Sequence, residues 1–177
     1  MTFIRLCLAA LLLQISVLTA EQSKQVPPAP VPPQILSAKK VFIANAGGEQ
    51  PAEDAQYSGD SDRAYNQFYA AMKTWGRYEL VESPAEADLW FEIRFTAPPA
   101  SRPVSQGNTL GTAEFDPQFR VVIRDPKTNA ILWAFTEHAG WAILKGNRDR
   151  NFDLGMTRIV TDVQRLSAQA SAGDPKK

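Results

Sequence analysis

The stretch LWFEIRFT, residues 89–96, decides the fold of this chain. Every second residue is apolar, and the positions between carry a tryptophan, a glutamate and an arginine. Successive side chains of a β-strand point to opposite faces, so this alternation predicts a strand with one buried face. The predicted core face carries Leu89, Phe91, Ile93 and Phe95, and the opposite face carries Trp90, Glu92 and Arg94.

Four further segments are predicted to be strands around this one. KKVFIAN at 39–45 is a short apolar run, and residues 78–82 form another. Residues 119–124 alternate, with arginine at 120 and 124, and the following DPKTN at 125–129 has the residue types of a turn. Residues 130–138 are therefore predicted to return as the second strand of a hairpin.

Two amphipathic helices complete the pattern. The first begins after an N-cap at Asp60 or Ser61 and ends at Gly76. Its apolar side is formed by Tyr65, Phe68, Tyr69, Met72 and Trp75. The second follows the polar stretch 145–151, where Asn151 or Asp149 is expected to cap it, and Gly155 weakens it locally. Its apolar side is formed by Phe152, Met156, Ile159, Val160, Val163 and Leu166.

The predicted order is therefore β-α-β-β-β-β-α. Two helices with one apolar stripe each must bury those stripes against a sheet. The sequence predicts an α+β fold, a two-layer sandwich in which a mostly antiparallel sheet carries two helices on one face.

The ends of the chain predict export. Residues 1–20 have a basic residue, Arg5, before a short apolar run, as in a signal peptide, with cleavage after Ala20 or after Thr19. An uncleaved anchor is the alternative. Residues 21–36 are predicted to be a proline-rich spacer, 37–167 a single α+β domain and 168–177 a flexible tail. The expected location is periplasmic or extracellular.

The amino-acid composition argues against several classes of function. The chain has 19 basic and 19 acidic residues, and loss of Arg5 with the signal leaves a net charge of −1. A nearly neutral domain has no global field for nucleic acid, and membrane contact is expected only through an uncleaved signal segment. Cys7, the only cysteine, leaves with the signal, and His138 is the only histidine. We therefore expect no metal and no cofactor, and a serine triad lacks its Gly-x-Ser-x-Gly turn.

Several motifs carry a resemblance to known domains. The helix end and next strands contain Trp75, Gly76, Tyr78, Val81, Ala87, Asp88 and Leu89, and the hairpin runs from Asp125 to Trp133, with Asn129 where glycine is common. In these motifs the chain resembles exported small-domain proteins of acidobacterial type. More loosely, it is similar to the amino-terminal domain of the TolB translocation protein and related periplasmic lipoprotein domains. The resemblance implies an envelope location and a binding or scaffolding role, and it carries over no catalytic residue.

The sheet face away from the helices is the candidate binding surface. It is predicted to carry Trp90, Glu92, Arg94, Arg120, Arg124 and Trp133, although the register of the last strand could place Leu132 and Ala134 there instead of Trp133 and Phe135. Aromatic and arginine side chains on an open face suit an envelope protein or a cell-wall glycan. The alternative is that Trp141 and the loop at 97–114 cover this face as a minor core.

Two functions follow from these observations. The favoured one is a non-enzymatic binding or assembly module of the cell envelope. The alternative is a small cell-wall-directed hydrolase that uses carboxylates, for which Glu82, Glu86, Asp88 and Glu92 are the candidates.

Overall fold

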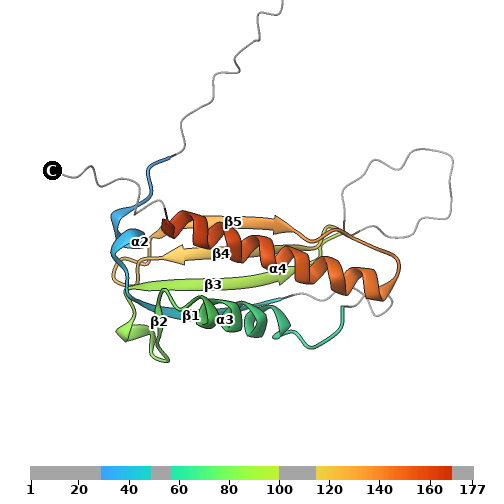
Figure 1. Ribbon diagram of the computed structural model, residues 1–177, viewed down its shortest axis with the longest axis horizontal. Coiled ribbons are helices and arrows are strands. Elements are labelled where there is room, and N and C mark those ends of the chain that lie inside the picture. The colour runs from blue at the N-terminus through green and yellow to red at the C-terminus, as the bar shows by residue number, and fades with distance from the viewer. Residues whose placement is uncertain (1–28, 49–56, 100–114, 169–177) are drawn as a thin grey trace, which may run out of the picture. The chain divides into compact units, whose positions relative to one another are not determined.

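The computed structural model describes residues 29–48, 57–99 and 115–168 of the 177-residue chain (Figure 1). The chain divides into two units, Met1–Pro30 and Val31–Lys177, and the fold belongs to the second. The predicted signal peptide, residues 21–28 of the predicted spacer, residues 100–114 of the predicted loop and nearly all of the predicted tail lie outside the described residues.

Five strands form one sheet in the order β2-β1-β3-β4-β5. Their bounds are β1 Lys40–Gly48, β2 Glu79–Leu80, β3 Leu89–Thr96, β4 Gln118–Arg124 and β5 Ile131–His138. β3 is the central strand, and its apolar residues lie on one face, as its alternation predicts. It pairs antiparallel with β4, and β4 pairs antiparallel with β5, whereas β1 runs parallel to both β3 and the short β2.

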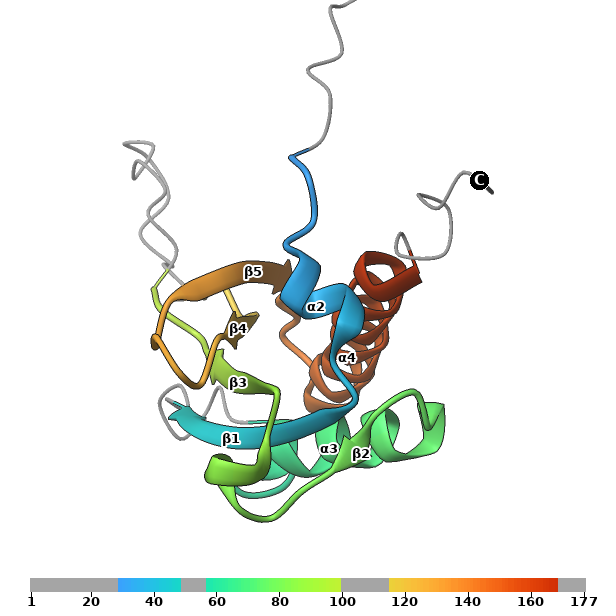
Figure 2. The ribbon, with the colours of Figure 1, turned by 90° about the vertical axis from the view of Figure 1, so that its left-hand side faces the viewer.

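Two long helices, α3 (Arg63–Trp75) and α4 (Lys145–Ala168), pack on the same face of this sheet (Figure 2). Phe68 of α3 contacts Phe91 of β3, and Phe152 of α4 contacts Phe95 of the same strand. Phe91 and Phe95 share one face of β3, so both helices cover that face. The predicted α+β fold, with its mostly antiparallel sheet and two helices on one face, is confirmed.

Two short helices add to this frame. The 3₁₀ turn η2 (Pro84–Glu86) leads into β3, where the sequence predicts a turn or a single helical turn. The helix α2 (Pro33–Ser37) lies partly within the range predicted to be spacer. Its Ile35 is fully buried in the core, so the chain already packs on the domain before residue 37.

The turns predicted from residue type are present. Gly76 ends α3 with a left-handed φ of 68°, a conformation that a residue with a Cβ adopts only with strain. Asn129 has a φ of 57° in the turn between β4 and β5. In that turn the Asp125 carboxylate accepts the backbone N–H of Lys127 at 2.7 Å, as an Asx turn does.

The helix starts differ from the prediction. α3 is preceded by Asp62, whose side chain makes no capping bond to the helix and instead accepts a hydrogen bond from Asn45. α4 begins at Lys145, so the polar stretch 145–151 is its first two turns and not a segment before it. This part of α4 lacks an apolar stripe because polar side chains hold it: Asn151 donates to the carbonyl of Gly140, and Asp149 accepts from Ser58.

A glycine sets the distance between α4 and the sheet. A Cβ added to Gly155 would lie 2.9 Å from Cε2 of Phe119 and 3.3 Å from Cβ of Ala139. Phe119 is fully buried, so its ring has no open space to move into. Gly155 therefore has a packing role that outweighs its low helix propensity.

We expect Gly155→Ala to destabilise the protein by about 1–3 kcal/mol through overpacking, although alanine alone favours a helix. Urea unfolding followed by circular dichroism measures this change. Gly146→Ala is the matched control, because no atom lies within 4 Å of the position of its added Cβ. An increase in stability for Gly155→Ala would contradict the close contact with Phe119.

Candidate functional site

The face of the sheet opposite the helices is built by strand alternation. Residues paired across antiparallel strands share a face. In β3 and β4 the pairs Trp90 with Arg124, Glu92 with Val122, and Arg94 with Arg120 all lie on the helix-free side. The neighbouring β1 adds Phe42 and Ala44, which pair with Trp90 and Glu92. We call this surface the open face.

Charge on the open face is mainly positive. The Nε of Arg124 donates to Glu92 Oε1 at 2.9 Å, and both side chains are about one quarter exposed. Arg94 and Arg120 are exposed and stand opposite each other across β3 and β4. Both are cations on one face of the sheet, and a guanidinium group can donate several hydrogen bonds at once.

A shallow hollow lies at the centre of this face. Its volume is about 240 Å³, and its lining consists of Ala46, Glu92, Arg94, Arg120, Val122, Arg124 and Ile131. Val122 is only 7% exposed, so the hollow has an apolar floor beneath three guanidinium groups and one carboxylate. Guanidinium groups bind carboxylate and phosphate oxygens in a bidentate geometry, and the hollow therefore suits an anionic ligand.

Five of the six residues predicted for the binding surface lie on the open face, and Trp133 does not. Trp133 pairs with Ile123 of β4 and packs against the core on the helix side. Placing it on the open face was wrong because alternation alone does not choose the register of β5, in which both alternating sets contain apolar residues. Ala134 and Thr136 occupy the open face instead.

The two other tryptophans near this face are held elsewhere. The indole N–H of Trp90 donates to the carbonyl of Pro84 in η2 at 3.0 Å, so Trp90 borders the face without lining the hollow. Trp141 packs on Phe115 with ring centroids 5.0 Å apart, next to the start of β4 and the end of β5.

A second hollow, of about 370 Å³, lies where α2, η2 and the β4–β5 turn meet. Its charged lining is balanced, with Lys39 and Lys127 against Asp88 and Asp125. The Asp88 carboxylate accepts the backbone N–H groups of Lys39 and Lys40 at 2.9 Å each, and these bonds lower the pKa of Asp88. Asp88 thus ties the start of β1 to β3, which is a structural role.

Of the carboxylates predicted for hydrolysis, Glu82 and Glu86 are exposed, and the other two are engaged in contacts within the fold. Glu92 is bound to Arg124, and Asp88 is bound to backbone amides. The pair that the structure brings together is Glu137 of β5 and Asp162 of α4. Burial raises the pKa of Asp162, and the hydrogen bond and charge of Glu137 raise it further. No sequence motif predicts this pair, because the two residues are brought together only by the packing of α4 on β5.

His138 is a strand-end histidine bound to a loop, as the sequence indicates. Its Nδ1 lies 2.7 Å from Asp116 Oδ1, and both side chains are about half exposed. Within the described residues, no hydrogen bond joins this imidazole to a hydroxyl group that could act as a nucleophile. In the same residues, no group of three or more histidine, cysteine or acidic side chains is placed to hold a metal ion.

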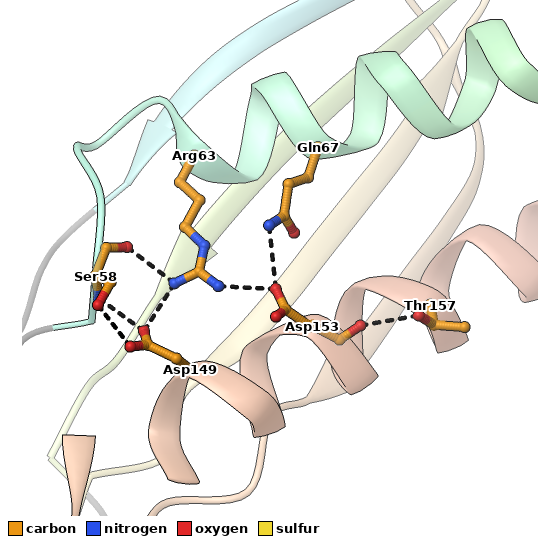
Figure 3. A network of polar contacts seen from close by, with 6 residues as sticks. All are labelled: Ser58, Arg63, Gln67, Asp149, Asp153 and Thr157. Carbon is orange, nitrogen blue, oxygen red and sulfur yellow. Dashed lines mark hydrogen bonds and ion pairs between the residues drawn. The ribbon is translucent and has the colours of Figure 1, made fainter. Parts of the chain in front are cut away.

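A network on the opposite side of the domain joins the two long helices (Figure 3). Arg63 of α3 binds Asp149 at 2.8 Å and Asp153 at 2.7 Å, both on α4. Arg63 thus joins two acids of α4 that lie far from it in the sequence. Burial raises the pKa of Asp149, but hydrogen bonds from Ser58 and Arg63 outweigh it, so the pKa lies below its ordinary value.

The fold and the open face define this protein as a small α+β domain with one sheet face free of helices. Among the described residues, no helix has the length and apolarity needed to cross a bilayer. No protein-family model matches the chain, and no curated protein matches its sequence significantly.

Several solved structures are similar in fold. A DUF4136 family protein from Bacteroides thetaiotaomicron is 12% identical, with a TM-score of 0.47 over 81% of this chain and 92% of that one. The DUF330 protein XCC0632 from Xanthomonas campestris is 11% identical, with a TM-score of 0.42 over 83% and 91%. The PelC dodecamer from Paraburkholderia phytofirmans is 13% identical, with a TM-score of 0.41 over 80% and 94%. At these values no function is transferred from them.

The two perturbed aspartates on α4 predict opposite effects of pH. A raised pKa in the folded state means that ionised Asp162 reduces stability above that pKa and that this cost disappears as the pH falls through it. A lowered pKa means that ionised Asp149 adds stability above its unfolded pKa, and that this gain is lost as the pH falls through the folded pKa.

We therefore expect Asp162→Asn to raise the free energy of unfolding at pH 7 by up to about 1 kcal/mol, since the pair is partly solvated. Asp149→Asn should lower the free energy of unfolding at the same pH. In thermal melts, the Asp162 difference should shrink as the pH falls from 7 towards 3.8, the ordinary pKa of an aspartate, whereas the Asp149 difference should persist to about pH 4 and shrink only below it. Equal signs for the two variants at pH 7 would contradict the described contacts.

Proposed function

We propose that this protein is an exported, non-enzymatic binding module of the cell envelope, and that the open face binds an acidic cell-wall glycan. The observation that carries this proposal is the hollow in the open face, where Arg94, Arg120 and Arg124 surround the apolar Val122. Export is supported by the amino-terminal sequence. An envelope role is also supported by the resemblance to TolB-type and related periplasmic domains.

The size and chemistry of the hollow favour a glycan over a protein partner. A volume of about 240 Å³ is close to the lower end of small-molecule sites and suits one or two sugar rings. A specific protein interface buries about 800 Å² on each partner and usually has an aromatic anchor at its centre. The tryptophan nearest the hollow, Trp90, is tied to Pro84 at the border of the face.

A binding role also fits the state of the carboxylates better than hydrolysis does. Glycoside hydrolysis needs two carboxyl groups on opposite sides of one bond. Glu92 is the only carboxylate among the described residues that line the hollow, and its charge is neutralised by Arg124. The pair of Glu137 and Asp162 lies on the helix side, where Arg158 binds Glu137 at 3.0 Å.

Replacing Arg94 and Arg120 together tests the proposal. We expect Arg94→Ala with Arg120→Ala to weaken binding to polygalacturonate, an acidic glycan, by about tenfold or more, because each lost charge-assisted hydrogen bond costs about 1.5–3 kcal/mol. Isothermal titration measures the affinity, with neutral dextran as the comparison ligand. Purified cell-wall sacculi provide the natural form of the ligand in a co-sedimentation assay.

Arg165→Ala is the matched control, because Arg165 is an exposed arginine of α4 on the helix side. It should leave glycan binding unchanged. Equal binding of dextran and polygalacturonate, or unchanged binding by the double variant, would contradict the proposal. Release of soluble sugar from sacculi by the purified protein would instead support the hydrolase.

A further inference from the structure

The turn between β5 and α4 holds two adjacent aliphatic side chains in solvent. Ile143 is 77% exposed and Leu144 is 67% exposed, the highest values among the exposed large apolar residues of the described chain. Figure 1 shows this connection at the end of the domain opposite α2. We call residues 141–145 the tip.

The exposure of these side chains is built into the fold, because α4 holds the backbone of the turn. Asn151 donates to the carbonyl of Gly140 at 2.7 Å. Arg148 donates to the carbonyls of Ala142 at 3.2 Å and Ile143 at 2.6 Å, and only 5% of Arg148 is exposed. A buried arginine that binds main-chain carbonyls fixes the turn and leaves Ile143 no route to the core.

The surroundings of the tip are amphipathic. The ring of Trp141 lies between Phe115 and the guanidinium of Arg148, which is 5.3 Å from the ring centroid. Lys145 and Arg150 are exposed, and neither makes an ion pair within the described residues.

The nearest described carboxylates are already engaged. Asp149 is bound by Arg63 and Ser58, and Asp116 is bound by His138. Among the described residues, the unpaired charge at the tip is therefore positive, although the mature chain as a whole has a net charge of only −1. Salt screens charges that lie more than about 10 Å apart, so a few basic residues can be attracted to an anionic membrane even when the whole domain has almost no net charge.

We propose that the tip inserts Ile143 and Leu144 into the surface of an anionic lipid bilayer. Two aliphatic side chains on a turn cover far less than the roughly 800 Å² per partner that a stable protein interface needs. Each part of the tip suits one layer of a bilayer surface. The two aliphatic side chains suit the acyl chains, the indole suits the interface, and the basic residues suit the anionic headgroups. The contact is weak and reversible, and it is independent of ligand binding at the open face.

A fluorescent label at the tip tests this insertion in the full chain, separately from any binding by the amino-terminal segment. In a Cys7→Ser background, Leu144→Cys is labelled with a nitrobenzoxadiazole probe. Leu154→Cys is the matched control, because Leu154 is an aliphatic residue of the described chain, 49% exposed, further along α4 and outside the hollow of the open face. Vesicles contain either phosphatidylglycerol with phosphatidylcholine or phosphatidylcholine alone.

We expect a blue shift of the label at 144 with the anionic vesicles, a much smaller shift with phosphatidylcholine alone, and none at 154. Adding Ile143→Asp should raise the vesicle concentration needed for the half-maximal shift at least about tenfold, since burying one aliphatic side chain corresponds to more than a factor of ten. High salt should weaken the shift.

An unshifted label at 144, an equal shift at 154, or a shift that Ile143→Asp leaves unchanged would overturn the proposal. A shift that grows with protein concentration without vesicles would overturn it in favour of a second copy of the chain. Thermal melts should be unaffected by these surface changes. If Leu144→Cys melts lower, the label is moved to Ile143→Cys, whose side chain is still more exposed.

Discussion

The ring of Phe152 is the contact on which the helix layer depends. It packs against Phe119 and Phe95 with centroids 4.7 and 4.8 Å apart, and the guanidinium of Arg63 lies 4.1 Å from its centroid. One side chain of α4 thus joins two strands to α3. Because Arg63 also binds Asp149 and Asp153, the cation over this ring is held by two carboxylates and desolvated on the ring side. Gly155, one turn further along α4, lets the helix approach closely enough for these contacts.

The helices cover one face of the sheet, and the other face carries charged and polar side chains. On β4 the same strand carries fully buried Val121 and Ile123 toward the helices and Arg120 and Arg124 away from them. Val122, between those two arginines, is nearly buried without any helix above it. The long arginine side chains shield it while their charged ends reach solvent, so the open face is stable in water yet has an apolar floor for a ligand.

Local patterns predicted the elements, whereas long-range pairing decided what they contact. The alternation of β3, the apolar side of α3, and the turns at Gly76 and Asn129 all follow from residue type and spacing. The register of β5 does not, because a shift between Ile123 and Arg124 interrupts its pairing with β4. The partners of Arg63 lie 86 and 90 residues away, a separation that no motif spans. The start of α4 was missed because its first turns are held by hydrogen bonds and have no apolar stripe.

The distribution of charge links these features to function. A net charge near zero argues against long-range attraction of nucleic acid or membranes, but it does not describe a local surface. Several acidic residues of the helix side are used within the fold: Asp149 and Asp153 hold Arg63, and Glu137 holds Arg158. The open face retains three arginines against one glutamate, and the tip retains Lys145 and Arg150. A nearly neutral chain can therefore present two positive surfaces, because net charge is a sum over the whole chain and these acidic residues lie on the helix side of the sheet.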